Sequence, residues 1–158
     1  MDTREQTARA IAFFEECDDI ALLHQLVAEI APRARRMVAG FLSRGTEEII
    51  PPPAELRAAR SPASRDEALK TVRTLSDFGL LQVVARAIGQ RAEAIEIVAS
   101  AEFPEGARVQ VPDMPRYPRS SRLVGGEVEA TGMSLTVRLD NGETWQGPAS
   151  LAQRAGPA

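Results

Sequence analysis

Apolar residues in the first hundred positions recur at the three- and four-residue spacing of amphipathic helices. A helix is predicted over residues 3–16, where Thr3 and Gln6 fit a capping box. A second helix is predicted from about residue 20 to a stop at Gly45, with Pro32 either kinking it or opening a new first turn. Its expected apolar stripe is Ile20, Leu23, Val27, Ile30, Ala34, Met37 and Phe41.

Proline and serine clusters separate this region from two further helices. Residues 51–53 are three prolines and are expected to be extended, followed by a short helical piece near residues 54–60. Ser64 and Glu67 form a second capping box for a helix that runs to about Leu75. Ser76 or Asp77 then caps a last long helix with the stripe Phe78, Leu81, Val84, Ile88, Ala92, Ile95 and Ala99. The pattern predicts about four main helices in one bundle-like layer.

The two long helices resemble each other when the chain is shifted by 58 residues. Residues 19–42 and 77–100 then share six identities in 24 positions, among them Ile30 with Ile88 and Arg33 with Arg91. One interpretation is that two amphipathic helices share a periodicity by necessity. The other is that a helical hairpin occurs twice and packs with pseudo-twofold symmetry.

The C-terminal third changes to the alternation typical of β-strands. Asn141-Gly142 supplies a hairpin turn, and residues 148–151 suggest a single 3₁₀ turn. A closing strand after Leu151 is expected to be weak, because Ala152-Gln153-Arg154-Ala155 is a poor strand sequence. The predicted strands are residues 107–111, 123–131, 134–139 and 143–147.

This order of elements resembles an SH3-like barrel of the Tudor or KOW type. The residues that carry the resemblance are Gly106-x-x-Val109-x-Val111, Gly126-x-Val128, Val137-x-Leu139-Asp140-Asn141-Gly142 and Leu151. The resemblance implies a small β-barrel over residues 103–158. Together with the helical pattern before it, this predicts an α+β protein with a helical domain over residues 1–102. The resemblance also implies that the barrel binds another molecule.

A second resemblance concerns the start of the barrel. Phe103-x-x-Gly106-x-x-Val109-x-Val111, followed by Arg116-Tyr117-Pro118-Arg119, is similar to the barrel domain of nitrile hydratase β-type subunits. In that family the barrel assists a partner subunit that carries the metal. The resemblance therefore implies an accessory-subunit role.

The environment of Trp145 depends on the register of the last hairpin. With a two-residue loop at Asn141-Gly142, Trp145 pairs with Arg138 on the outer face, where a cation–π contact is expected. With a three-residue loop that includes Asp140, Trp145 instead pairs with Val137 and points into the core. Burial is favoured, because the module has few other large residues.

Composition narrows the class of protein. The chain has 158 residues, 44% of them hydrophobic, and a formal net charge of -3. This charge opposes binding to nucleic acid and to anionic membranes. Without an N-terminal signal sequence or a long apolar run, we expect a soluble bacterial cytoplasmic protein.

The side chains that usually carry catalysis are scarce. His24 is the only histidine and Cys17 the only cysteine, so neither a nucleophile–base device nor a zinc site is favoured. Glycine-rich phosphate loops are absent, and Gly125-Gly126 suggests a bulge or a close approach of strands. We therefore predict no catalytic residue, no metal and no cofactor.

The best binding candidate is the segment from Arg116 to Arg122, which carries three arginines, one tyrosine and no acid. Arginine forks suit phosphate or carboxylate groups, and tyrosine can stack. The alternative is an ordinary surface loop neutralised by Glu127, Glu129 or the acidic helices. The candidate binding residues are Arg116, Tyr117, Arg119, Arg122, Arg138 and Trp145.

Three functions remain open on these grounds. The first is a non-enzymatic interaction or scaffold protein with a protein partner, which can also form homo-oligomers. The second is a nucleic-acid-associated regulator that uses the Arg116–Arg122 segment. The third is an accessory subunit or maturation factor of a metalloenzyme.

Overall fold

The computed structural model describes residues 2–43, 56, 59 and 61–155, apart from the side chains of residues 41 and 42. The chain divides into two compact units, Met1–Arg91 and Ala92–Ala158, which we call the helical unit and the sheet unit. The division falls within a helix, before the 102/103 boundary suggested by the sequence. The last turns of that helix belong with the sheet unit, because Ala99 packs against the core of the sheet.

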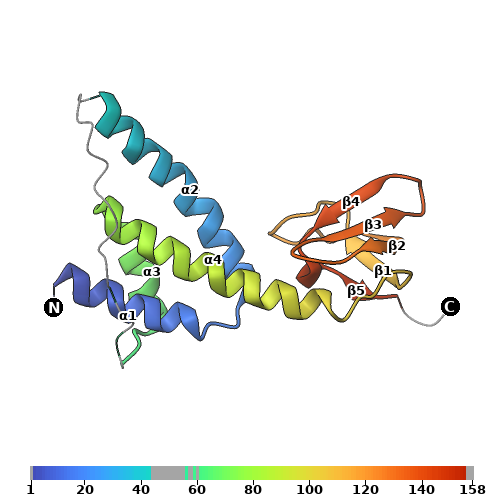
Figure 1. Ribbon diagram of the computed structural model, residues 1–158, viewed down its shortest axis with the longest axis horizontal. Coiled ribbons are helices and arrows are strands. Elements are labelled where there is room, and N and C mark those ends of the chain that lie inside the picture. Colours follow the sequence, from blue (N-terminus) through green and yellow to red (C-terminus); the bar gives the residue numbers. More distant parts are fainter. Residues whose placement is uncertain (1, 44–55, 57–58, 60, 156–158) are drawn as a thin grey trace. The chain divides into compact units, whose positions relative to one another are not determined.

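Four main helices precede the strands, as predicted (Figure 1). They are α1 (Thr3–Glu15), α2 (Ile20–Ser43), α3 (Arg65–Thr74) and α4 (Phe78–Ser100). Helix α2 continues through Pro32. The expected stop at Gly45, the three prolines and most of the helical piece near residues 54–60 lie outside the described residues. Within the described part of the chain, no helix is both long and apolar enough to cross a membrane.

The helix starts are fixed by acidic and hydroxyl side chains. The Ser64–Glu67 capping box is present at α3, as predicted. At α1 the predicted Thr3–Gln6 box is wrong, because Asp2 lies one residue earlier and accepts a bond of 2.7 Å from the Glu5 N–H. At α4, Asp77 rather than Ser76 accepts from the Leu80 N–H at 3.0 Å.

The expected stripe of α2 is buried only in part. Leu23 and Ile30 are buried, Ile20, Ala34 and Met37 are partly buried, and the Phe41 side chain lies outside the described residues. Val27 is 40% exposed, and Leu26 is fully buried in its place. Leu23, Leu26 and Ile30 follow the three- and four-residue spacing equally well, so spacing alone did not separate the two choices.

Two arginines connect the α1–α2 hairpin with the α3–α4 hairpin, and each hairpin supplies one of them. Arg33 of α2 donates to the carbonyl oxygens of Val72 and Leu75, both at 2.7 Å, at the C-terminal end of α3. Arg91 of α4 donates to the Cys17 carbonyl oxygen at 2.8 Å, just beyond α1. Arg33 and Arg91 are 58 positions apart, and so are Cys17 and Leu75. The α1–α2 hairpin therefore binds the C-terminal end of α3, and the α3–α4 hairpin binds the residue that follows the end of α1.

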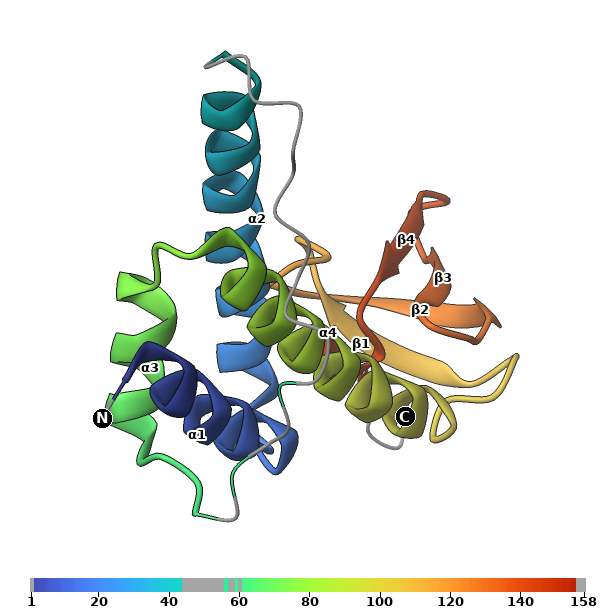
Figure 2. The ribbon, with the colours of Figure 1, turned by 60° about the vertical axis from the view of Figure 1, so that its left-hand side comes forward.

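Other contacts repeat at the same spacing. Asp19 caps α2 through the Leu22 N–H at 3.1 Å, as Asp77 caps α4. Helices α1 and α3 pack side by side, and Arg9 and Glu67, which are equivalent positions, form an ion pair of 3.3 Å (Figure 2). A direct contact between equivalent positions is what a pseudo-twofold axis produces. These contacts favour a duplicated hairpin over a coincidence of periodicity. Pairs buried at both equivalent positions are Ala10/Ala68, Phe14/Val72, Cys17/Leu75, Leu22/Leu80, Leu23/Leu81, Leu26/Val84 and Ile30/Ile88.

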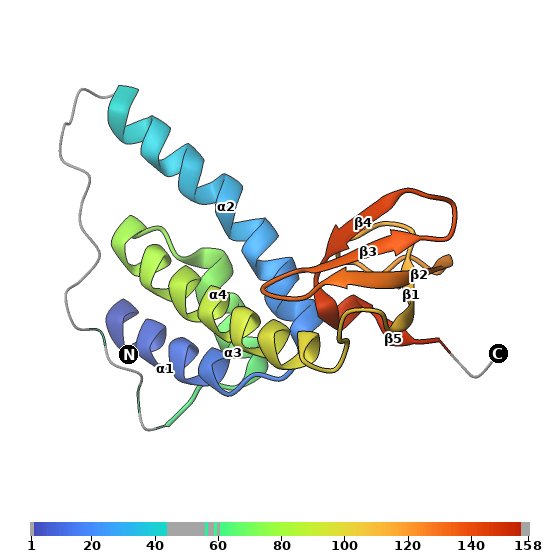
Figure 3. The same ribbon diagram turned by 45° about the vertical axis from the view of Figure 1, so that its right-hand side comes forward.

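The sheet unit contains one antiparallel sheet of five strands in the order β4-β3-β2-β1-β5 (Figure 3). The two-residue β5 pairs only with β1, as expected from its weak sequence. The sequence predicted only a weak closing strand and left closure of the barrel open; in the structure β4 and β5 do not pair, so the sheet is not closed. The elements are β1 (Arg108–Pro112), β2 (Leu123–Ala130), β3 (Leu135–Leu139), β4 (Thr144–Gly147), the 3₁₀ helix η1 (Ala149–Leu151) and β5 (Gln153–Arg154).

The last hairpin adopts the register that buries Trp145. Val137 lies opposite Trp145, and Gly142 has a φ of +90°, which favours glycine. Gly126 marks the predicted close approach, because a Cβ there would lie 2.6 Å from the Arg138 carbonyl oxygen. The sheet core consists of Phe103, Val109, Val111, Val128, Leu135, Val137, Leu139, Trp145, Ala149 and Leu151.

Candidate functional site

The candidate site is the loop between β1 and β2, residues 113–122. Its base is closed by a hydrogen bond of 2.9 Å from the Asp113 N–H to the Arg122 carbonyl oxygen. The Ser120 hydroxyl donates to the carboxylate of Asp113, the only acid in the loop. The loop is therefore a closed extension of the β1–β2 hairpin.

Two of the predicted binding residues hold the loop in place. The Tyr117 hydroxyl and the Ser150 hydroxyl are hydrogen-bonded at 2.9 Å, and the Tyr117 ring packs against the sheet core. The Arg119 guanidinium donates to the Ser150 carbonyl oxygen at 2.9 Å. Tyr117 and Arg119 thus tie the loop to η1.

A buried carboxylate supports Ser150 from α4. Glu96 is only 4% exposed, and its carboxylate accepts the Ser150 N–H at 2.9 Å as well as the Ser150 hydroxyl. The sequence interpretation missed Glu96. A signal was present, because this acid lies four residues after Ala92 and three before Ala99, on the apolar stripe of the helix.

Trp145 and Gly147 hold the other side of the loop. The Trp145 ring is 3% exposed, and its Nε1–H donates to the Pro112 carbonyl oxygen at 2.9 Å. Pro115 lies over Gly147 so closely that an added Cβ would be 2.8 Å from the Pro115 Cβ. Trp145 therefore supports the loop from inside and offers no ring face at the surface.

The remaining two arginines of the loop take no part in these contacts. The side chains of Arg116 and Arg122 are exposed, and neither forms a hydrogen bond or ion pair with any residue that the structure describes. Two exposed apolar side chains flank them, Met114 at 41% and Leu123 at 39%.

Two other arginines of the sheet unit, Arg108 and Arg138, form ion pairs with acids. Arg138 forms an ion pair with Glu129, so Glu129 does not neutralise the loop. Arg108 and Asp140 form a two-bond pair at 2.9 and 2.8 Å. This guanidinium lowers the pKa of Asp140, and the carboxylate raises the pKa of Arg108. The structure does not bring Arg138 into the network around Ser150.

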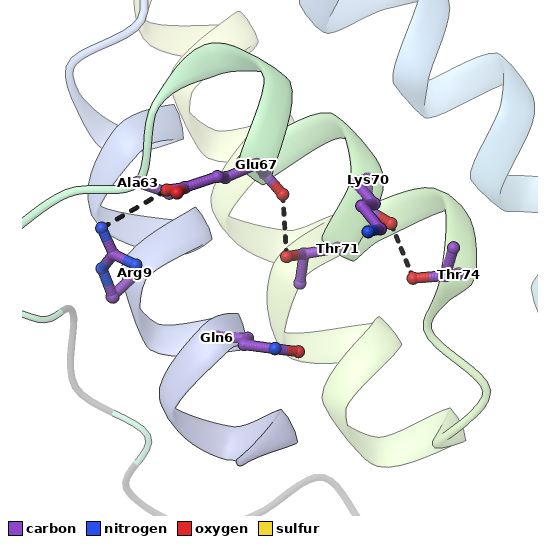
Figure 4. A pocket seen from close by; sticks show the side chains of 7 residues that line it. All are labelled: Gln6, Arg9, Ala63, Glu67, Lys70, Thr71 and Thr74. Atoms are coloured by element: carbon purple, nitrogen blue, oxygen red, sulfur yellow. Dashed lines mark hydrogen bonds and ion pairs between the residues drawn. The ribbon is translucent and has the colours of Figure 1, made fainter. Parts of the chain in front are cut away.

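The helical unit has a polar cleft between α1 and α3 (Figure 4). Arg9 and Glu67 pair across it. The hydroxyls of Thr71 and Thr74 donate to carbonyl oxygens of their own helix, and so they do not point to a ligand. The cleft is lined by Gln6, Arg9, Ala63, Glu67, Lys70, Thr71 and Thr74.

The residues considered for catalysis or metal binding are dispersed or structural. Cys17 is buried beyond α1 and its carbonyl oxygen binds Arg91, while His24 is partly buried on α2. Asp19 is a helix cap, and the Leu22 N–H, followed by Arg65, lowers its pKa. Among the described residues, no group of three His, Cys, Asp or Glu side chains is placed to hold a metal ion.

Comparison with known proteins gives no match to any family model, curated protein or solved structure. The assignment of function therefore depends on the geometry of the two units.

Proposed function

We propose that this chain is a non-enzymatic interaction or accessory protein, and that its sheet unit contacts the partner through the β1–β2 loop. The observation that carries the proposal is the way the loop is held. Tyr117, Arg119, Trp145 and Pro115 fix it from two sides, while Arg116 and Arg122 stay available to another molecule. A loop held in one conformation loses little entropy on binding, which favours affinity.

The proposal includes a relation to SH3-like barrels. Support comes from the order of elements: four antiparallel strands, a 3₁₀ turn after β4, and a short last strand that returns to β1. In this proposal the sheet unit is an open member of that class, whose short β5 pairs with only two residues of β1.

The nucleic-acid alternative has less support. Single-stranded nucleic acid is usually bound by aromatic side chains on which bases stack. Tyr117, the only aromatic residue of the loop, uses its hydroxyl on Ser150 and packs against the core. Two available arginines and a net charge of -3 give a weak electrostatic basis for a polyanion.

The test is affinity capture with the full chain in a lysate of its native organism, followed by mass spectrometry. We expect the chain to retain a specific protein, and a metalloenzyme subunit would identify the accessory role. Tyr117→Phe, which removes the bond to Ser150, should weaken retention, whereas Glu93→Gln on the exposed side of α4 should not. Retention of no protein by the wild-type chain would refute the proposed function.

A further inference from the structure

The two helical hairpins differ in charge at one pair of equivalent sites. Beyond the end of α1, Arg91 forms an ion pair of 2.7 Å with Asp18. At the end of α3, Arg33 binds the Leu75 carbonyl oxygen at 2.7 Å, and the position equivalent to Asp18 is Ser76. Arg33 forms no ion pair with any acid that the structure describes. The carboxylate that neutralises Arg91 therefore has no counterpart at Arg33.

Glu29, on the same helix as Arg33, does not fill this role. Its carboxylate accepts from Arg73 at 3.3 Å and from Gln25 at 3.2 Å. The bond from Arg73 lowers the pKa of Glu29 most, and Arg33 makes the smallest contribution to that lowering. Glu29 is therefore occupied by another cation.

Arg33 lies at an open hollow between α2 and the α3–α4 turn, with a volume of about 380 Å³. Only two of its N–H groups are used, by the carbonyl oxygens of Val72 and Leu75, so others remain for a ligand. Arg36 is exposed and forms no hydrogen bond or ion pair with any described residue. The site, which we call the Arg33 hollow, is lined by Arg33, Arg36, Met37, Leu75 and Ser76.

The second half of α2, which forms one side of the hollow, is less covered than its counterpart on α4. None of the side chains described in residues 31–43 is buried. Ala34 and Val38 are partly exposed there. Their equivalents on α4, Ala92 and Glu96, are both buried. Two cations beside an apolar face that lacks cover favour a contact with an acidic, partly apolar protein segment.

We propose that the Arg33 hollow binds an Asp or Glu side chain of a partner protein, together with a neighbouring large apolar side chain that covers Met37. The carboxylate takes at Arg33 the place that Asp18 takes at Arg91, and Arg36 adds a second cation. A second copy of this chain fits less well, because a twofold contact through this face would bring the arginines of both copies together. The inference goes beyond the proposed function, since it assigns a second binding site, in the helical unit.

The experiment is a subtractive selection from a random-peptide display library with the full chain. Peptides that bind wild type are kept, and those that also bind Ser76→Asp are removed. In that variant the new carboxylate should pair with Arg33 and close the hollow to ligands. We expect the remaining peptides to be rich in Asp or Glu next to Leu, Ile, Met or Phe. Ser76→Asn, the uncharged control, should bind them like wild type.

Removal of one cation gives a second test with a matched control. Arg36→Gln should bind labelled copies of these peptides at least about tenfold more weakly than wild type. Arg35→Gln removes the same charge from the next exposed position of α2, which does not line the hollow, and should bind them like wild type. Far-ultraviolet circular dichroism checks that each variant is folded.

Several results would overturn the inference. The subtraction could leave no peptide, or only peptides without acidic residues, or peptides that Arg36→Gln and Arg35→Gln bind equally. Dimerisation of wild type that Ser76→Asp abolishes, measured by sedimentation, would identify a second copy as the occupant and would also overturn it. A lysate protein that Tyr117→Phe loses and Ser76→Asp retains uses the β1–β2 loop, so the proposed function and this inference can fail separately.

Discussion

Ser150 is the residue on which the arrangement of the sheet unit depends most. Its N–H and hydroxyl both bind Glu96, its hydroxyl also contacts Tyr117, and its carbonyl oxygen accepts from Arg119. Glu96 is buried and Ser150 is partly buried, so few waters can replace this carboxylate. One carboxylate therefore links α4, η1 and the β1–β2 loop.

Glu96→Ala should reduce the free energy of unfolding by about 1–3 kcal/mol, because it removes the acceptor of two partly buried donors, the N–H and the hydroxyl of Ser150. Glu96→Gln should cost less, since its amide oxygen still accepts one bond. Urea denaturation followed by Trp145 fluorescence measures both. Glu93→Ala, an exposed substitution on the same helix, is the control. Equal stability of Glu96→Ala and wild type would contradict the role given to Glu96.

A second prediction concerns the contact between the loop and β4. Gly147→Ala places a Cβ 2.8 Å from the Pro115 Cβ and 3.1 Å from the Trp145 ring, so the loop must move. We expect a loss of about 1–3 kcal/mol and a changed Trp145 emission maximum. Gly132→Ala is the matched control, because no atom lies within 4 Å of its added Cβ. An unchanged emission spectrum in Gly147→Ala would show that Pro115 does not pack there.

At the scale of elements, the reciprocal arginines determine how the helical hairpins hold together. Helix ends leave carbonyl oxygens without a partner in the helix, and a cation there is favourable. Arg33 meets this need at α3, and Arg91 meets it beyond α1, where it also pairs with Asp18 at 2.7 Å.

Arg33→Ala and Arg91→Ala should therefore destabilise the helical unit by similar amounts, about 1–3 kcal/mol each. Thermal unfolding followed by far-ultraviolet circular dichroism measures the effect. Arg35→Ala, an exposed position on α2, should stay within about 0.5 kcal/mol of wild type. A large loss in only one of the two variants would argue against equivalent roles.

Features that depend on residues close together in the sequence could be predicted, whereas features that depend on distant residues could not. The helix and strand ranges came from spacing and turn residues, and the α3 capping box involves residues only three positions apart. The other caps were harder to predict, because neighbouring residues can both cap a helix. Thr3 was predicted where Asp2 is the cap, and Ser76 and Asp77 were both left open. The sheet remained open because β5 has only two paired residues, which local pattern showed only as a weak strand.

The candidate site could be predicted only in outline. Its arginines were visible in the sequence as a local cluster. Which side chains of the loop hold it in place depends on Ser150, about thirty positions away, because Tyr117 and Arg119 bind that residue. Glu96 binds Ser150 across 54 positions, and no local pattern encodes that contact. Arg138 and Trp145 were grouped with the loop on chemistry alone. Their neighbours in the sheet, Glu129 and Pro112, determine their orientation.

At the scale of the whole molecule, three carboxylates make stability depend on pH in one direction. The pKa is lowered at Asp19 by the Leu22 N–H and Arg65, at Glu29 by Arg73 and at Asp140 by Arg108. Because each folded-state pKa lies below the unfolded one, these groups stabilise the fold above about pH 4–5. That contribution is lost as the pH falls through the lowered values.

Urea unfolding at a series of pH values should show a falling free energy of unfolding below about pH 5. Asp19→Asn keeps a capping oxygen and removes the charge. Its deficit relative to wild type should be largest near neutral pH and shrink in acid. High salt should reduce the part due to the exposed Arg108–Asp140 pair. A deficit that is constant at every pH would show that the Asp19 charge plays no part.

Reciprocal contacts also make the helical hairpins exchangeable between molecules. Arg33 needs only an α3 end, and Arg91 needs only the Cys17 carbonyl beyond an α1 helix. Neither requirement specifies that both hairpins belong to one polypeptide. Two chains that trade their first hairpins would satisfy every such contact twice, so a domain-swapped dimer requires no new interface, only a high concentration of chains.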